Sequence, residues 1–198
     1  LESRGGFAIE RIYADRAYGR RVETMESPRW EKLQAVIEKT RPAVVHIICA
    51  VTEQRRVPYL SFERGRQDAF NLVTARHLCD MVRARNRPGP FVVLDIARPS
   101  SEWETMRCLL LRNHFAAELI GVEGVSGVLA TGLAQSWDVE RQADIVTGHV
   151  AQGSSQQELA AAMQQLLVQD ADDFDRRVAF GATALFSSEP ELPCALQS

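Results

Sequence analysis

The side chains able to do covalent or metal chemistry are four cysteines and four histidines spread along the chain. A thiol beside an imidazole can form the nucleophile and base of a hydrolase, and the same two groups bind zinc. His77, Cys79, Cys108 and His114 come nearest to a ligand set, but no Cys-x-x-Cys or His-x-x-x-His spacing accompanies them. The sequence therefore predicts no metal site, and it predicts reduced cysteines that serve mainly in packing.

Two apolar runs must position whatever chemistry the chain has. Residues 43–50 (AVVHIICA) and 91–97 (FVVLDIA) are both typical of buried parallel strands. In open α/β sheets, functional groups lie just outside the carboxyl ends of such strands. Ala50 closes the first run and Ala97 closes the second. Neither position carries an acid, a base or a nucleophile.

Two polar groups lie inside the first run. His46 is in mid-strand, and we expect a hydrogen-bonded core histidine there. Cys49 directly precedes Ala50, but neighbouring strand residues point to opposite faces of a sheet. A thiol nucleophile displaced by one residue is therefore disfavoured.

Strand and helix patterns alternate along the rest of the chain, which predicts an α/β fold with a parallel sheet and right-handed crossovers. Residues 52–57 are polar and show no pattern, and residues 63–71 are predicted as a charged connection. Proline at the first helical position and Arg41-Pro42 at the end delimit the first helix. The predicted strands are 7–13, 43–51, 59–62, 91–97, 125–133 and a segment within 174–185, and the predicted helices are 28–40, 74–85, 101–119, 137–151 and 155–168, the last capped by Ser154 or Ser155.

The order of these elements and several residue stretches resemble the CHAT domains, which are caspase-like cysteine peptidases. Val45 to Val51 (VHIICAV) aligns with a family strand such as VHFACHG, and Val92 to Ala97 (VVLDIA) aligns with one such as VVLNAC. Further similar stretches are LRNHFAAEL at 111–119, GVLATGL at 127–133 and GSS at 153–155. The resemblance covers about residues 30–170 and implies a caspase-like three-layer α/β/α fold with a mostly parallel central sheet.

In that family the second histidine of the first pattern is the general base and the cysteine of the second is the nucleophile. Here the matching positions are Ala50 and Ala97, and Val51 replaces the family's glycine. A thiolate attacks the peptide carbonyl while an imidazole moves the proton, and alanine does neither. The resemblance therefore implies a pseudopeptidase that binds a protein or peptide partner in a vestigial substrate cleft.

The resemblance also implies which residues line that cleft. Asp95, Ala97, Val51 and Arg98 are the expected binding residues. An acid near Asp95 lines a pocket for a basic side chain in related peptidases, so Asp95 is expected either to receive an arginine or lysine or to be a buried structural group that caps a loop or pairs with Arg98.

Two alternatives stay open at this point. In the first, the chain is a CHAT cysteine endopeptidase whose active-site residues were replaced by alanine, although the additional change at Val51 favours natural loss. In the second, the resemblance misleads, and the chain is another doubly wound domain such as a ligand-binding or receiver module.

Composition limits the remaining classes of function. The chain has 198 residues, 45% of them hydrophobic, and a formal net charge of −3, which predicts one domain over 1–198 and gives no basis for nucleic-acid binding. No apolar stretch approaches the ~18–20 residues that span a bilayer. The glycines at 121, 124 and 127 precede a strand rather than a helix, so we expect no nucleotide or other cofactor. We expect a cytoplasmic fragment of a larger protein, which can also self-associate. The resemblance implies that it works in a bacterial defence or signalling system.

Overall fold

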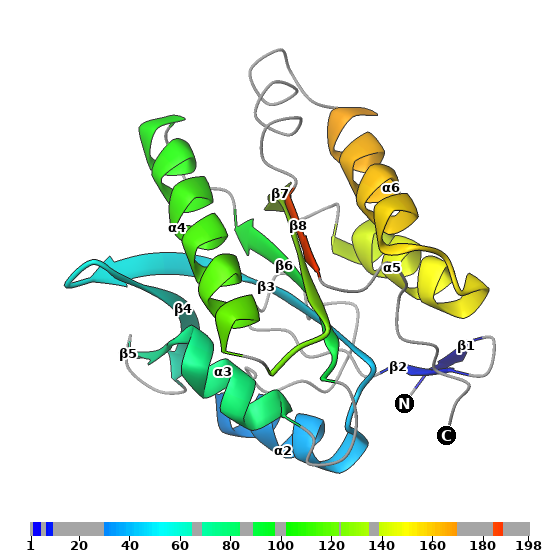
Figure 1. The fold of residues 1–198 in the computed structure, drawn as a ribbon, viewed down its shortest axis with the longest axis horizontal. Coiled ribbons are helices and arrows are strands. Elements are labelled where there is room, and N and C mark those ends of the chain that lie inside the picture. The colour runs from blue at the N-terminus through cyan, green and yellow to red at the C-terminus, as the bar shows by residue number, and fades with distance from the viewer. Residues whose placement is uncertain are drawn as a thin grey trace.

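A computed structural model describes residues 2–4, 7–9, 30–64, 69–83, 89–97, 102–122, 124–134, 139–169 and 184–187. Within these ranges it contains a six-stranded sheet, a separate two-stranded pair and five helices (Figure 1). The strands are β1 (Glu2–Arg4), β2 (Phe7–Ile9), β3 (Val44–Gln54), β4 (Val57–Arg64), β5 (Ala69–Val73), β6 (Phe91–Ala97), β7 (Gly127–Ala134) and β8 (Ala184–Ser187). The helices are α2 (Trp30–Thr40), α3 (Ala75–Val82), α4 (Glu102–Gly121), α5 (Val139–Gln152) and α6 (Gln156–Gln169).

The large sheet has the strand order β5-β4-β3-β6-β7-β8. Its centre is parallel, because β6 pairs in parallel with β3 on one side and with β7 on the other. The outer pairings, β3–β4, β4–β5 and β7–β8, are antiparallel. The fold is therefore α/β with a mixed sheet, and the expectation of a mostly parallel sheet is met only by the three central strands.

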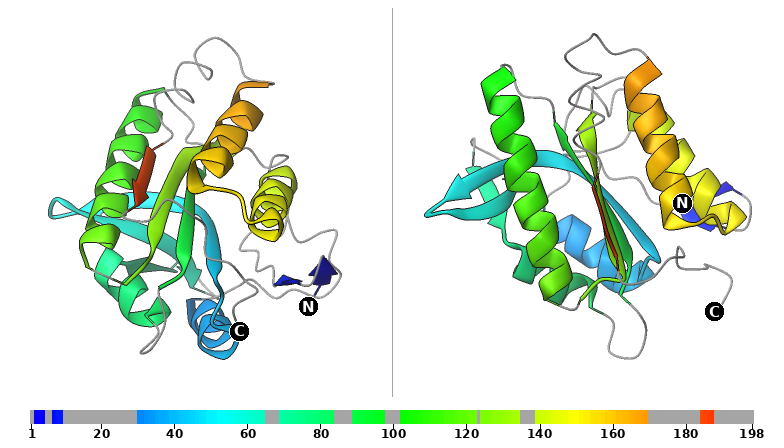
Figure 2. Two further views of the ribbon diagram at one scale, coloured as in Figure 1. Left: turned by 45° about the vertical axis from the view of Figure 1, so that its right-hand side comes forward. Right: turned by 45° about the horizontal axis from the view of Figure 1, so that its top comes forward.

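Helices cover both faces of this sheet (Figure 2). Alternate residues of the central strands divide between two hydrophobic clusters, because successive side chains of a strand point to opposite faces. Val92 and Leu94 join a cluster with α3 and α4, and we call this side the α4 face. Phe91 and Val93 join a cluster with α5 and α6, and we call that side the α5/α6 face.

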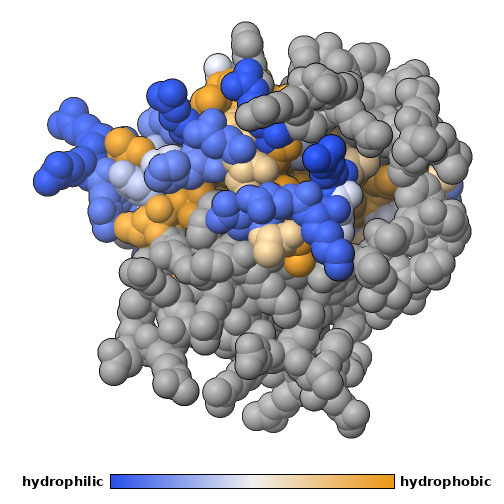
Figure 3. Space-filling view, turned by 90° about the horizontal axis from the view of Figure 1, so that it is seen from below, coloured by the Kyte–Doolittle hydropathy of each residue, from blue (hydrophilic) through white to orange (hydrophobic). Residues whose placement is uncertain are grey.

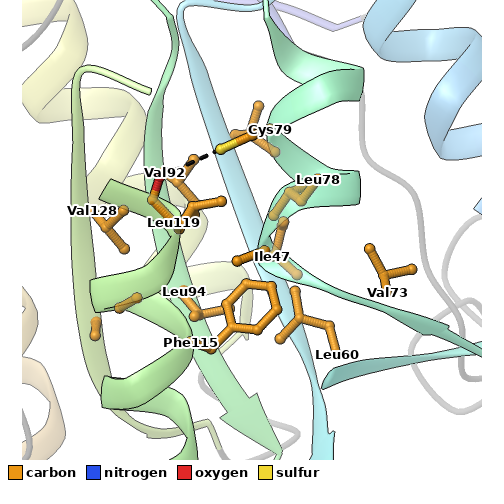
Figure 4. Close-up of a cluster of buried hydrophobic side chains, with 14 of the residues drawn as sticks. Ile47, Leu60, Val73, Leu78, Cys79, Val92, Leu94, Phe115, Leu119 and Val128 are labelled. Atoms are coloured by element: carbon orange, nitrogen blue, oxygen red, sulfur yellow. Dashed lines mark hydrogen bonds between the residues drawn. The ribbon is translucent and has the colours of Figure 1, made fainter. Parts of the chain in front are cut away.

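The larger cluster holds the α4 face together (Figure 4). Phe115 and Leu119 of α4 pack there with Leu94 of β6, and Leu78 and Cys79 carry the contact onto α3. The Cys79 Sγ donates to the Leu119 carbonyl at 3.4 Å. The two helices thus pack as one layer against the central strands on the α4 face.

Local sequence signals explain several helix ends. Arg41, with φ 47°, ends α2 by a left-handed turn, and its N–H donates to the carbonyl of Ile37. Ser155 caps α6 by accepting from the Glu158 N–H, and the Ser155 N–H donates to the Glu158 Oε2 at 2.7 Å, which completes a capping box. These two ends agree with the sequence expectations.

The structure departs from those expectations mainly between β3 and α3. The first apolar strand does not end near residue 51 but continues to Gln54 and turns back directly into β4. The short strand expected at 59–62 is the middle of β4, and β5 occupies part of the expected charged connection. Residues 10–13, 174–183 and 188–198 lie outside the described ranges.

Candidate functional site

The backbone register brings the two alanine positions together. In the β3–β6 pairing, residues advance one step at a time from Val44 opposite Phe91 to Cys49 opposite Ile96. Ala50 and Ala97 are the next residues of the two strands, directly after the last recorded pair. Adjacent strands lie about 4.8 Å apart. The positions that the resemblance assigns to a base and a nucleophile therefore follow directly on a pair of neighbouring residues.

The surroundings of the two positions differ. β6 ends at Ala97, as expected for a residue at the carboxyl edge of the sheet. Ala50 is not at a strand end, because β3 continues past it and pairs it with Ser61 of β4. The side chain of Ala50 is exposed, so this part of β3 is open to a partner.

The predicted binding residue Val51 lies elsewhere. Its side chain is only 7% exposed and belongs to the hydrophobic cluster of the α4 face. It points away from Ala50 because adjacent strand residues alternate between faces. Val51 is thus a core residue in this structure, and its assignment to the lining of a cleft is corrected. Arg98 lies outside the described residues.

Asp95 and His46 form the polar centre of the site. The His46 Nε2 lies 2.8 Å from the Asp95 Oδ2, although the residues are 49 apart in sequence. Both occupy strand positions on the α5/α6 face; the Asp95 side chain is fully buried, and that of His46 is 15% exposed. Asp95 is therefore a buried group that pairs with His46, and the hydrogen-bonded core histidine expected at position 46 is confirmed.

The second carboxylate oxygen of Asp95 gives the site unused hydrogen-bonding capacity. Within the part of the chain that the structure describes, Asp95 Oδ1 is buried without a hydrogen-bond partner, and so is the Thr131 hydroxyl on the adjoining strand β7. The β6–β7 register shifts at this point, between Leu94 and Ile96. Such irregularities re-aim side chains and are frequent beside binding sites.

Arg112 adds a buried positive charge that the sequence analysis did not identify. It lies on the inner side of α4, with its Nε and Nη2 donating to the Asn113 Oδ1 at 3.2 and 2.8 Å. Burial lowers the pKa of the Arg112 guanidinium to about 10, and the negative charge of Asp95 opposes that shift. The available signal was its position three residues after Leu109 and three before Phe115, which places an arginine on an apolar helix stripe.

The thiols near the site are held in their protonated form. Burial raises the pKa of Cys49 to about 12; a backbone hydrogen bond from Ser61 lowers it in part, and the Asp95 charge raises it further. Burial likewise raises the pKa of Cys79 to about 11 and that of Cys108 above its ordinary value. A thiol with so high a pKa is a poor nucleophile near neutral pH.

Two further features bear on the classes of site. Among the described residues, no three histidine, cysteine, aspartate or glutamate side chains lie close enough together to hold a metal ion. None of the helices in the described ranges combines the length and the apolar character that crossing a bilayer requires.

Comparison with known proteins gives no relative from which a function can be carried over. No protein-family model matches the chain, and no curated protein matches it either. Interpretation of the site therefore depends on its geometry and on the residue stretches quoted above.

Proposed function

We propose that this chain is a catalytically inactive, caspase-like domain of the CHAT type, which binds a protein or peptide partner over β3 at Ala50 and the end of β6. The observation that carries the proposal is the β3–β6 register, whose last pair, Cys49 with Ile96, directly precedes Ala50 and Ala97. A peptidase dyad needs its base and its nucleophile within hydrogen-bond reach, which residues on adjacent strands provide. Alanine at both positions leaves the backbone arrangement of the two strands in place but supplies neither a base nor a nucleophile.

The polar groups beneath these positions support binding rather than bond cleavage. Asp95 offers one unsatisfied carboxylate oxygen, while His46 fixes the other. The Asp95 side chain is fully buried, so a partner's basic side chain would have to enter the core beside it to supply the missing donor. An extended partner segment would meet the exposed side of β3 at Ala50, with Ala97 at the end of β6. The domain would then act as a regulatory or capturing module in the cytoplasm.

The first test restores the dyad with Ala50→His and Ala97→Cys while leaving Val51 unchanged, because Val51 is part of the core. The probe is a set of peptide acyloxymethyl ketones with arginine, lysine or aspartate next to the reactive group. We expect no labelling of the original protein and labelling of residue 97 in the double variant, with each single substitution much less reactive. A folded double variant that no probe labels contradicts the proposed cleft.

The same variant separates the proposal from its alternative. Labelling without turnover of a mixed peptide pool supports a groove that has kept binding and lost catalysis. Rapid cleavage of the pool would instead support the alternative, a cysteine endopeptidase whose dyad was replaced by alanine. The two results differ in whether the acyl intermediate is hydrolysed, which requires oxyanion donors and a positioned water.

A second test measures binding directly. Ala50→Trp adds bulk at an exposed position of β3, and Gln54→Trp adds the same bulk at an exposed position near the hairpin turn. Peptides selected for binding to the original protein should lose affinity to Ala50→Trp and keep it to Gln54→Trp. Equal affinity for both variants would place the binding surface elsewhere.

A further inference from the structure

The tip of the β3–β4 hairpin has a backbone geometry that its residues do not favour. Gln54 pairs with Val57, so the connection is a two-residue loop formed by Arg55 and Arg56. Their φ values are 52° and 67°. A two-residue hairpin loop with both central residues at positive φ is ordinarily formed by Asn-Gly. At positive φ a Cβ crowds the backbone carbonyl; glycine has no Cβ, and the short polar side chain of asparagine offsets the cost by local hydrogen bonds.

Nothing in the packing of the tip compensates for this strain. Both arginine side chains are exposed, and within the described ranges neither makes an ion pair. Exposed residues held in disfavoured backbone regions occur disproportionately at sites that bind or switch. The turn would therefore be more stable with asparagine and glycine than with these two arginines.

The charge around the tip is positive, in contrast to the chain as a whole. The nearest carboxylate on the hairpin, Glu53, is paired with Arg107 of α4 at 3.2 Å. That ion pair connects the hairpin to α4, and it leaves Glu53 unavailable to pair with Arg55 or Arg56. The hairpin projects from the body of the molecule, and the left-hand projection in Figure 3 is hydrophilic (Figures 1 and 3).

We propose that the Arg55–Arg56 tip docks against an acidic segment of a partner protein. Guanidinium groups form bidentate hydrogen bonds with carboxylates, which gives both affinity and orientation. The formal net charge of −3 disfavours a nucleic acid, whose binding depends on a broadly basic surface. The tip stands apart from the Ala50 and Ala97 positions, so this proposal holds whether or not they line a cleft.

The test uses a fluorescent hexaglutamate peptide as probe and measures anisotropy at low salt and at physiological salt. The variant Arg55→Asn/Arg56→Gly replaces the tip with the residues that the turn prefers. We expect its affinity for the peptide to fall by at least about tenfold, since two charge-assisted contacts are removed. Its melting temperature should rise, which shows that the loss of binding does not come from unfolding.

The matched control is Arg76→Asn on α3 with Arg83→Asn at its C-cap, which removes the same charge from two other exposed positions. This control should bind the peptide within about twofold of the original protein, because the surface far from the tip is screened by salt. The proposal is overturned by a tip variant that binds as well as the original, by a control that loses as much affinity, or by an original protein that does not bind the peptide at low salt. Tighter binding of a single-stranded oligonucleotide than of the peptide would also overturn it.

Discussion

Gly124 lies against α3, where the structure leaves no room for a side chain. A Cβ built on Gly124 would meet the Cys79 Cβ and Sγ at 2.8 Å each. Cys79 cannot easily withdraw, because it is buried within the cluster of the α4 face and donates to the Leu119 carbonyl (Figure 4). Gly124→Ala therefore forces α3 away from α4 or strains the turn before β7.

The expected loss follows from this overlap. Overpacking a closely packed core by a single methyl group costs about 1–3 kcal/mol of the free energy of unfolding. For a chain of this size, that loss lowers the melting temperature by roughly 2–12 °C. Urea unfolding followed by tryptophan fluorescence gives the free energy, and far-UV circular dichroism gives the melting temperature.

A matched control exists three residues earlier. A Cβ on Gly121, the last residue of α4, would meet nothing within 4 Å. Gly121→Ala should leave stability unchanged or raise it slightly, because alanine favours a helix more than glycine does. The double variant Gly124→Ala/Cys79→Ala removes the Sγ overlap and should be more stable than the sum of the single changes predicts. Equal stability of Gly124→Ala and Gly121→Ala would refute the close contact between Gly124 and Cys79 of α3.

Three further predictions follow from the polar groups. His46→Ala should lower the free energy of unfolding by about 1–3 kcal/mol, because it leaves the buried Asp95 carboxylate without its partner. The control is His77→Ala at an exposed histidine, and an equally small loss for both variants would contradict the pairing. The pKa values of the Cys49 and Cys79 thiols are raised to about 12 and 11, so both thiols should resist iodoacetamide at pH 8 in the folded protein and react after unfolding. Mass spectrometry of the alkylated peptides measures the labelling. Rapid labelling of Cys49 in the folded protein would contradict the prediction. Hydrogen bonds with Ser155 lower the pKa of Glu158. The α6 cap therefore contributes stability above the ordinary pKa of 4.5 and loses that contribution as pH falls through the lowered pKa. Glu158→Gln should flatten this part of the curve of melting temperature against pH, and an unchanged curve would show that the capping box does not form.

Elements bounded by strong local signals could be predicted from the sequence. β6 occupies 91–97 as expected, because a proline-rich stretch precedes an unbroken apolar run. The cap of α6 was predicted at Ser154 or Ser155, because serine favours the N-cap position, and it lies at Ser155. In both cases the sequence neighbours alone determine the conformation.

The β3–β4 hairpin could not be predicted, because its turn lacks the usual residues. Arg55 and Arg56 give no signal for a two-residue loop, so the polar stretch from 52 to 57 was interpreted as unpatterned. The sheet is mixed rather than mostly parallel in part because this turn sends the chain straight back beside β3.

The candidate site was only partly accessible to sequence reasoning, because its contacts are long-range. The strand-end position of Ala97 could be inferred, whereas Ala50 lies within β3. The pairing of His46 with Asp95 depends on a register between strands that lie far apart in sequence. The burial of Val51 follows from β3 continuing past residue 51, which no local pattern indicated.

The position of β8 has a consequence for how the chain is made. Five of the six strands in the large sheet are complete once residue 134 has left the ribosome, but the partner of β7 on its outer edge arrives only with residues 184–187. Until then the backbone groups along that edge lack the hydrogen bonds that β8 supplies, and α6 lacks its contacts with β8. The newly synthesised chain therefore passes through an interval in which β7 is an edge strand of a nearly finished sheet, and pairing with another nascent chain competes there with the arrival of its own last strand.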